Sequence, residues 1–238
     1  MGFSRKDSDE YKVNTVDPLK ELDVKDNVSF VNKDGCGKRI MFAGNSTLRH
    51  GVSERIGWLR DCGMAASSED KDYAHILMKR VSEIDPNAVF HITQCSTWER
   101  RFWDDEVYKN FEAAKDFAPD ILIYRLGENV TLDSLKDHDL KDGIRHLIKY
   151  LTEKNPNAEV IFTTNFWIRE AVDNAIIEVA AEYGKEAHDL GLIGENPEMK
   201  ALGLFEHAGV AAHPGDKGME AIADVIWNEL KELMMNGE

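Results

Sequence analysis

The chain has 238 residues, of which 42% are hydrophobic and 31% charged, and this composition is typical of a folded globular domain rather than a disordered or membrane protein. The formal net charge is −15, from 29 Lys and Arg against 44 Asp and Glu. Such a charge repels nucleic-acid phosphates and anionic lipid, and no cluster of Lys and Arg reverses it locally. Neither nucleic acid nor a membrane is therefore an expected partner.

Residues 1–33 are predicted to be an irregular lead-in to a single α/β domain that spans residues 34–238. Val28–Val31 predicts one short strand, either as an edge element or as part of a tail. No apolar signal-peptide region is visible, and no apolar run is long enough to span a bilayer. The three cysteines have no CxxC spacing and indicate neither a zinc site nor a disulfide framework. A cytoplasmic location is therefore expected, with secretion after removal of a leader as the alternative.

Short apolar runs alternate with amphipathic segments through the rest of the chain. The runs are rich in Ile, Val and Phe, which favours strands at residues 39–43, 88–93, 120–124, 159–163 and 186–190. Helical spacing of apolar residues predicts helices at 70–84, 98–117, 140–153, 169–183 and 217–234. Ser67 and Asp70 resemble a capping pair for the first of these helices. The order predicts a three-layer α/β/α sandwich around a mostly parallel, five-stranded, flavodoxin-like sheet.

Three polar residues follow strands or precede a helix at positions where α/β sheets bind ligands, beyond the carboxyl ends of the strands. Ser46 follows the strand at 39–43, Asn129 follows the strand at 120–124, and His213 precedes the last helix. Each has an ordinary alternative as a helix cap, a turn residue or a loop residue. Together, a hydroxyl nucleophile, an amide donor and an imidazole are the minimum set for acyl transfer.

With these blocks the chain resembles the SGNH, or GDSL-type, esterases and lipases, from about Lys38 to Leu233. The family blocks Gly-Asp-Ser, Gly-x-Asn-Asp and Asp-x-x-His-Pro have as counterparts Gly44-Asn45-Ser46, Gly127-Glu128-Asn129 and Val210-Ala211-Ala212-His213-Pro214. The resemblance implies the SGNH-hydrolase fold, Ser46 as nucleophile and His213 as general base. It also implies an oxyanion hole made by the Ser46 N–H, the Asn129 side chain and an N–H of the family's second block.

The support of the histidine departs from the family pattern. Family enzymes place a carboxylate three residues before the His, where this chain has Val210. We therefore expect either a Ser-His dyad, with His213 oriented by a backbone carbonyl, or a carboxylate from elsewhere. Glu206 is the nearest upstream candidate and Asp216 the nearest downstream, although Asp216 is better placed to cap the final helix.

The second block lacks the glycine of the family, because the strand at 88–93 leads into Gln94-Cys95-Ser96. Cys95 or Ser96 can still supply the oxyanion N–H, since any residue except proline carries one. The thiols themselves are more typical of small buried apolar residues than of nucleophiles. Asn45 and Val130, where the family has Asp, are expected to alter turn hydrogen bonds more than chemistry.

Several side chains near the predicted site have two interpretations. Arg125 and Glu128 flank the third block and either contact a polar substrate or pair with each other. Four aromatic residues lie just beyond strand ends, where they either pack in the core or form a platform for a sugar ring; these are Trp98, Phe102, Trp103 and Trp167. No metal-ligand spacing, GxGxxG or P-loop pattern is present, so no metal or organic cofactor is expected.

The sequence thus predicts a serine ester hydrolase that cleaves small acyl esters through an acyl-enzyme on Ser46. The polar composition, without a lid-like apolar segment, favours a carbohydrate deacetylase over a lipase. Two alternatives come from other classes. One is a catalytically impaired SGNH-like domain that binds a glycan or a protein, suggested by the missing carboxylate at Val210. The other is a flavodoxin-like binding module.

Overall fold

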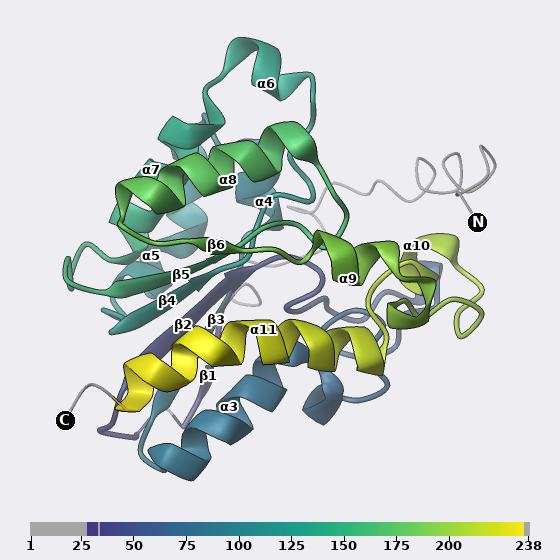
Figure 1. Ribbon diagram of the computed structural model, residues 1–238, viewed down its shortest axis with the longest axis horizontal. Helices are drawn as coiled ribbons and strands as arrows, with labels where there is room; N and C mark the ends of the chain where they lie inside the picture. Colours follow the sequence, from purple (N-terminus) through teal and green to yellow (C-terminus); the bar gives the residue numbers. More distant parts are fainter. Residues whose placement is uncertain (1–27, 33, 236–238) are drawn as a thin grey trace.

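The structure, a computed structural model, describes residues 28–32 and 34–235 and is a three-layer α/β/α sandwich (Figure 1). The strands of this part of the chain are β1 (Val28–Val31), β2 (Arg39–Gly44), β3 (Val89–Gln94), β4 (Ile121–Tyr124), β5 (Glu159–Thr163) and β6 (Ala187–His188). The α-helices are α3 (Tyr73–Ile84), α4 (Ser96–Arg100), α5 (Glu112–Lys115), α6 (Ser134–Asp137), α7 (Leu140–Leu151), α8 (Glu170–Glu182), α9 (Gly191–Glu195), α10 (Ala208–Ala211) and α11 (Asp216–Met235). Four 3-10 helices are described in addition, η2 (Glu54–Ile56), η3 (Glu69–Lys71), η4 (Asp105–Phe111) and η5 (Pro197–Met199).

The sheet has the strand order β1-β3-β2-β4-β5-β6. Strands β2 to β6 run parallel to one another, which confirms the predicted parallel sheet of five strands. The segment Val28–Val31 forms a sixth strand that pairs antiparallel with β3, so it is an edge strand rather than a tail. The other residues of the predicted lead-in, 1–27 and 33, lie outside the described residues.

The two faces of the sheet are covered by different helices, because alternate side chains of a strand point to opposite faces. In β2, Ile40 and Phe42 pack with α3 and α11, whereas Met41 and Ala43 pack with α7 and α8. Figure 1 shows these two helix layers on opposite sides of the sheet. Strands buried on both faces are hydrophobic throughout, and this is why the apolar runs could be recognised in the sequence. None of the helices between residues 28 and 235 that the structure describes is long and apolar enough to cross a membrane.

Two predicted helices differ from the observed ones. The first starts at Tyr73 rather than at residue 70, because the carboxylate of Asp72 accepts the His75 N–H and caps it there. The prediction of one helix over 98–117 is wrong. This segment is divided into α4, η4 and α5, and Asp104 caps the second piece by accepting the Glu106 N–H. Asp104 begins a new helical piece inside the apolar pattern. Periodicity alone does not reveal such a cap.

The parallel register brings the carboxyl ends of the central strands to one edge. Gly44 at the end of β2 lies opposite Gln94 of β3, and Ala43 lies opposite Tyr124 of β4. The segments that follow these strands are the nucleophile turn after β2, the Cys95-Ser96 segment after β3 and the loop with Asn129 after β4. The fold therefore places the nucleophile turn beside the loops that hold the other candidate residues.

Candidate active site

Ser46 occupies a tight turn directly after β2. The Asn45 carbonyl accepts the N–H groups of Leu48 and Arg49 at 2.9 and 3.0 Å, and its side-chain Oδ1 accepts the Thr47 N–H at 3.2 Å. Gly44 allows this turn, because a Cβ at that position would lie 2.6 Å from the Cβ of Leu48. No acceptor for the Ser46 N–H exists among the residues that the structure describes. This N–H therefore remains able to bind an oxyanion next to its own hydroxyl.

The structure brings Ser46 and His213 together although 167 positions separate them. The Ser46 Oγ lies 2.9 Å from Nε2 of the histidine, and Nδ1 lies 2.7 Å from the carbonyl oxygen of Gly209. A carbonyl oxygen can only accept, so Nδ1 carries the ring proton of the neutral imidazole. Nε2 consequently presents a lone pair to the serine hydroxyl, which is the arrangement that a general base requires.

The environment of His213 keeps its imidazole neutral. The side chain is only 8% exposed, and its pKa is lowered from 6.5 to about 4, chiefly because burial disfavours the charged ring. Positive charge on His50, Arg125 and His207 lowers the pKa further, whereas the hydrogen bond to Gly209 raises it. The edge of Trp167 packs against the ring, with a centroid distance of 5.1 Å and an interplanar angle of 79°.

Among residues 28–32 and 34–235, no carboxylate is hydrogen-bonded to Nδ1 of His213, which faces the Gly209 carbonyl instead. Val210 is completely buried in an apolar cluster with Trp58, and Glu206 is exposed. Asp216 accepts hydrogen bonds from the N–H and the hydroxyl of Ser67, and it is the first residue of α11 rather than its cap. Of the alternatives left open by the sequence, the observed geometry is the dyad with a backbone carbonyl on Nδ1.

The side-chain amide of Asn129 is held by hydrogen bonds at both its nitrogen and its oxygen. Its Nδ2 donates to Oε2 of Glu99 at 2.6 Å, and its Oδ1 accepts from Arg100 at 3.2 Å. Since an amide nitrogen carries two hydrogens, one N–H remains for a second acceptor. This is the group that the sequence predicted as an oxyanion donor.

Cys95 does not have the free N–H that was expected of it. Its backbone N–H donates to the Gly44 carbonyl at 2.6 Å, as a continuation of the pairing between β3 and β2. The Ser96 N–H donates to the side chain of Gln94 at 2.9 Å. The Cys95 thiol is buried, and burial raises its pKa well above the usual value. Neither residue of this segment therefore offers an oxyanion donor in the observed arrangement.

Arg125 and Glu128 pair with each other, which is one of the two interpretations of the sequence. A nitrogen of the guanidinium lies 2.7 Å from Oε1 of the glutamate, and both side chains are buried. The guanidinium also lies over the ring of Tyr73, at 5.6 Å from the centroid. The second oxygen of Glu128 accepts from Asn45 Nδ2 at 2.6 Å, which links this ion pair to the nucleophile turn.

Glu99 is a site residue that sequence reasoning did not find. It is completely buried and contacts both Asn45 and Asn129, and it belongs to the segment 98–117 that was predicted to be one helix. No local pattern distinguishes it from the exposed carboxylates that follow in the same segment. Glu99 lies within α4, where Ser96, Thr97 and Trp98 are buried as well.

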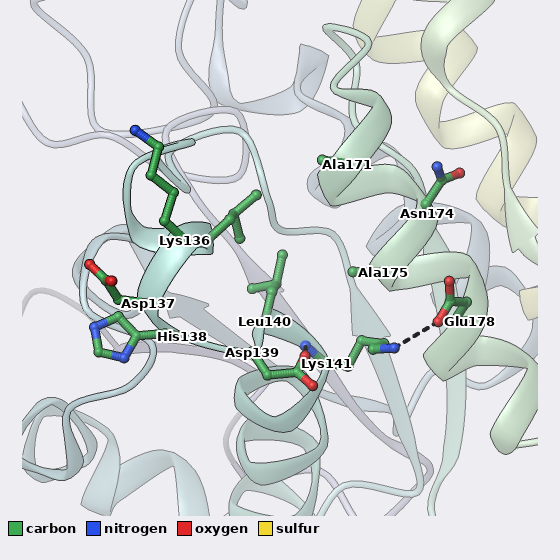
Figure 2. Close-up of a pocket in the computed structure, with 11 residues that line it drawn as sticks. Lys136, Asp137, His138, Asp139, Leu140, Lys141, Ala171, Asn174, Ala175 and Glu178 are labelled. Atoms are coloured by element: carbon green, nitrogen blue, oxygen red, sulfur yellow. Dashed lines mark hydrogen bonds and ion pairs between the residues drawn. The ribbon is translucent and has the colours of Figure 1, made fainter.

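The predicted aromatic residues near the strand ends differ in their exposure. Trp98 and Phe102 are core residues, whereas Trp103 is 42% exposed and stacks on His138 at 4.2 Å. A hollow of about 540 Å³ lies between the α6–α7 segment and α8, and none of the predicted site residues lines it (Figure 2). A second hollow, of about 520 Å³, includes Gly215 next to the histidine loop. No group of three or more potential metal ligands occurs within the described ranges.

Comparisons with known proteins identify the fold. No family model matches the chain, and no curated protein matches it. Among solved structures, an acetyl xylan esterase is 16% identical, with a TM-score of 0.51 over 81% of this chain and 99% of its own. The lipase/acylhydrolase from Enterococcus faecalis is 15% identical, with a TM-score of 0.51 over 83% of this chain and 97% of its own. The chain thus has the predicted SGNH-hydrolase fold.

Proposed function

We propose that this protein is a serine ester hydrolase in which Ser46 is the nucleophile and His213 the general base. The observation that supports it most strongly is the hydrogen bond of 2.9 Å between the serine hydroxyl and Nε2 of a neutral imidazole whose tautomer is held by the Gly209 carbonyl. A serine hydroxyl is a weak nucleophile until a base removes its proton, and this geometry supplies the base.

The reaction follows from these positions. His213 takes the Ser46 proton while Oγ attacks the ester carbonyl, and the imidazolium then protonates the leaving alcohol. The Ser46 N–H and the remaining Nδ2 hydrogen of Asn129 stabilise the oxyanion. Water, activated by His213, hydrolyses the acyl-enzyme and regenerates both residues.

The substrate class is a small acyl ester, with an acetylated carbohydrate as the favoured case. One fold neighbour is named as an acetyl xylan esterase. The hollow beside the histidine loop has both polar and apolar walls, a combination that suits the hydroxyls and the ring face of a sugar. Its polar side chains are Arg60, Ser67, Glu198, Lys200, Asp216 and Lys217, and Leu204 and Phe205 line it as well. We expect acetate esters of oligosaccharides to be cleaved with a higher kcat/KM than long-chain acyl esters.

Hydrolysis of p-nitrophenyl acetate by four proteins tests the assignment. The wild type is expected to turn over, Ser46→Ala and His213→Ala to lose roughly 10⁴-fold or more in kcat, and Ser68→Ala to retain full activity. Ser68 is a suitable control because its hydroxyl is exposed and bonds only to Asp70 in the described part of the chain. A fluorophosphonate should label Ser46 in the wild type.

Two results would contradict the proposal. Full activity of Ser46→Ala would remove the assigned nucleophile. A wild type without turnover above buffer, and without labelling at Ser46, would favour a glycan- or protein-binding module on the same fold.

A further inference from the structure

Glu99 lies behind the nucleophile turn as a buried carboxylate surrounded by hydrogen-bond donors. It extends from α4, is completely buried, and accepts four hydrogen bonds. Oε1 accepts from Asn45 Nδ2 at 3.0 Å, from the Gly127 N–H at 2.6 Å and from the Asn129 N–H at 3.4 Å. Oε2 accepts from Asn129 Nδ2 at 2.6 Å. One carboxylate therefore joins the residue before the nucleophile to the loop that carries the oxyanion amide.

Glu99 has no ion-pair partner among the described residues. Arg125 forms its ion pair with Glu128, and no Lys, Arg or His in the described ranges forms one with Glu99. The anion is stabilised by amide and backbone donors instead, which is the usual way to hold a buried carboxylate without a counter-ion. Burial and the nearby Glu128 raise the pKa of Glu99, whereas its hydrogen bonds lower it.

We propose that Glu99 is the positioning residue of the active site, and that it sets the orientation of the Asn129 amide relative to Ser46. This inference rests on the proposed ester hydrolysis. One Nδ2 hydrogen of Asn129 is held by Glu99, so the other is directed away from the carboxylate and is available to the oxyanion. The same carboxylate holds Asn45, whose turn delivers the nucleophile. Glu99 thus couples the two halves of the site without touching the substrate.

Glu99→Gln is the informative substitution, because it keeps the size of the side chain while it removes the charge and replaces one acceptor oxygen by an NH₂ donor. All four partner groups, which belong to Asn45, Gly127 and Asn129, are donors. The new NH₂ group must therefore face at least one of them and break a hydrogen bond. Removal of one oxyanion donor costs about 10²–10³ in kcat. Misorientation of Asn129 should cost about 10–100-fold in kcat and leave KM within about 3-fold.

A double-mutant cycle separates positioning from stability. In an Asn129→Ala background, Glu99→Gln should lower kcat at least about 3-fold less than it does in the wild type, because the amide that it orients is already gone and only its bond to Asn45 remains. Asp120→Asn is the matched control. That carboxylate accepts the Arg39 N–H at 2.9 Å at the start of the strands, and its loss should lower stability while leaving kcat unchanged. Equal losses from Glu99→Gln in both backgrounds, or a wild-type kcat for the single variant, would overturn the proposal.

The side-chain amide of Asn129 provides a measurement that does not depend on turnover. In the wild type its two Nδ2 protons should have separate NMR signals, one of them shifted downfield and slow to exchange through its bond to Glu99. In Glu99→Gln both signals should move towards those of a solvent-exposed amide. Unchanged signals would refute the positioning role even if the esterase activity is real. Altered signals in a protein without turnover would instead reject the proposed function alone.

Discussion

Acidification is expected to inactivate this protein only near pH 4, well below the value for an ordinary histidine base. The acid limb of kcat/KM reports the pKa of the base in the free enzyme, and burial lowers that of His213, the proposed base, to about 4. The cause is burial of the ring, together with positive charge on His50, Arg125 and His207. Relative to a pKa of 6.5, protonation in the folded protein is less favourable by about 3 kcal/mol.

The same change makes a prediction for stability. The folded pKa of His213 lies below that of the unfolded chain, so between pH 6.5 and 4 the unfolded state binds more protons. Stability from the neutral ring is therefore present above pH 6.5 and is lost as the pH falls towards 4. Activity must be compared at pH values where the protein is still folded, and circular dichroism at each pH provides that control.

The assay is the initial rate of phenyl acetate hydrolysis between pH 3.5 and 8, followed by phenol absorbance, which does not change with pH in this range. We expect kcat/KM to be flat from pH 8 to about 5 and to fall to half near pH 4. A half-maximum between pH 6 and 7, in a protein that circular dichroism shows to be folded, would refute the assignment of a buried and unsupported base.

Three further predictions concern stability. Val210→Asp should lower the free energy of unfolding, measured with denaturant, by roughly 3 kcal/mol or more, because its carboxylate enters an apolar cluster. It should not raise kcat, because the Gly209 carbonyl already orients the histidine. Val52→Asp, at an exposed position, is the control. Burial lowers the pKa of His91 to about 3, so His91→Gln should reduce the loss of stability between pH 6.5 and 3 by roughly 4 kcal/mol, and an unchanged loss would contradict this. Gly127→Ala should be far more destabilising than Gly184→Ala, since both have positive φ but a Cβ at Gly127 meets Asn165 at 2.6 Å and one at Gly184 meets nothing within 4 Å. Equal melting temperatures of the two glycine variants would rule out that contact.

The class of fold could be predicted because its signals are local. Each buried strand is a short apolar run, and each long helix carries an apolar face, so both can be recognised within about a dozen residues. The same locality placed Ser46 and Asn129 directly after strands and His213 before the last helix. Where the pattern misled, at 98–117, a polar cap at Asp104 interrupted a segment with the right composition for one continuous helix.

The chain's own order of residues thus determined the parallel sheet, its edge and the three side chains most suited to acyl transfer. Only the tertiary structure decided what surrounds them. Packing sets the partners and directions of three groups of hydrogen bonds. The Gly209 carbonyl accepts from His213, the Cys95 N–H donates to Gly44, and the buried Glu99 accepts from Asn45 and Asn129. The bond from Asn45 to Glu99 spans 54 positions, so no local pattern could reveal it.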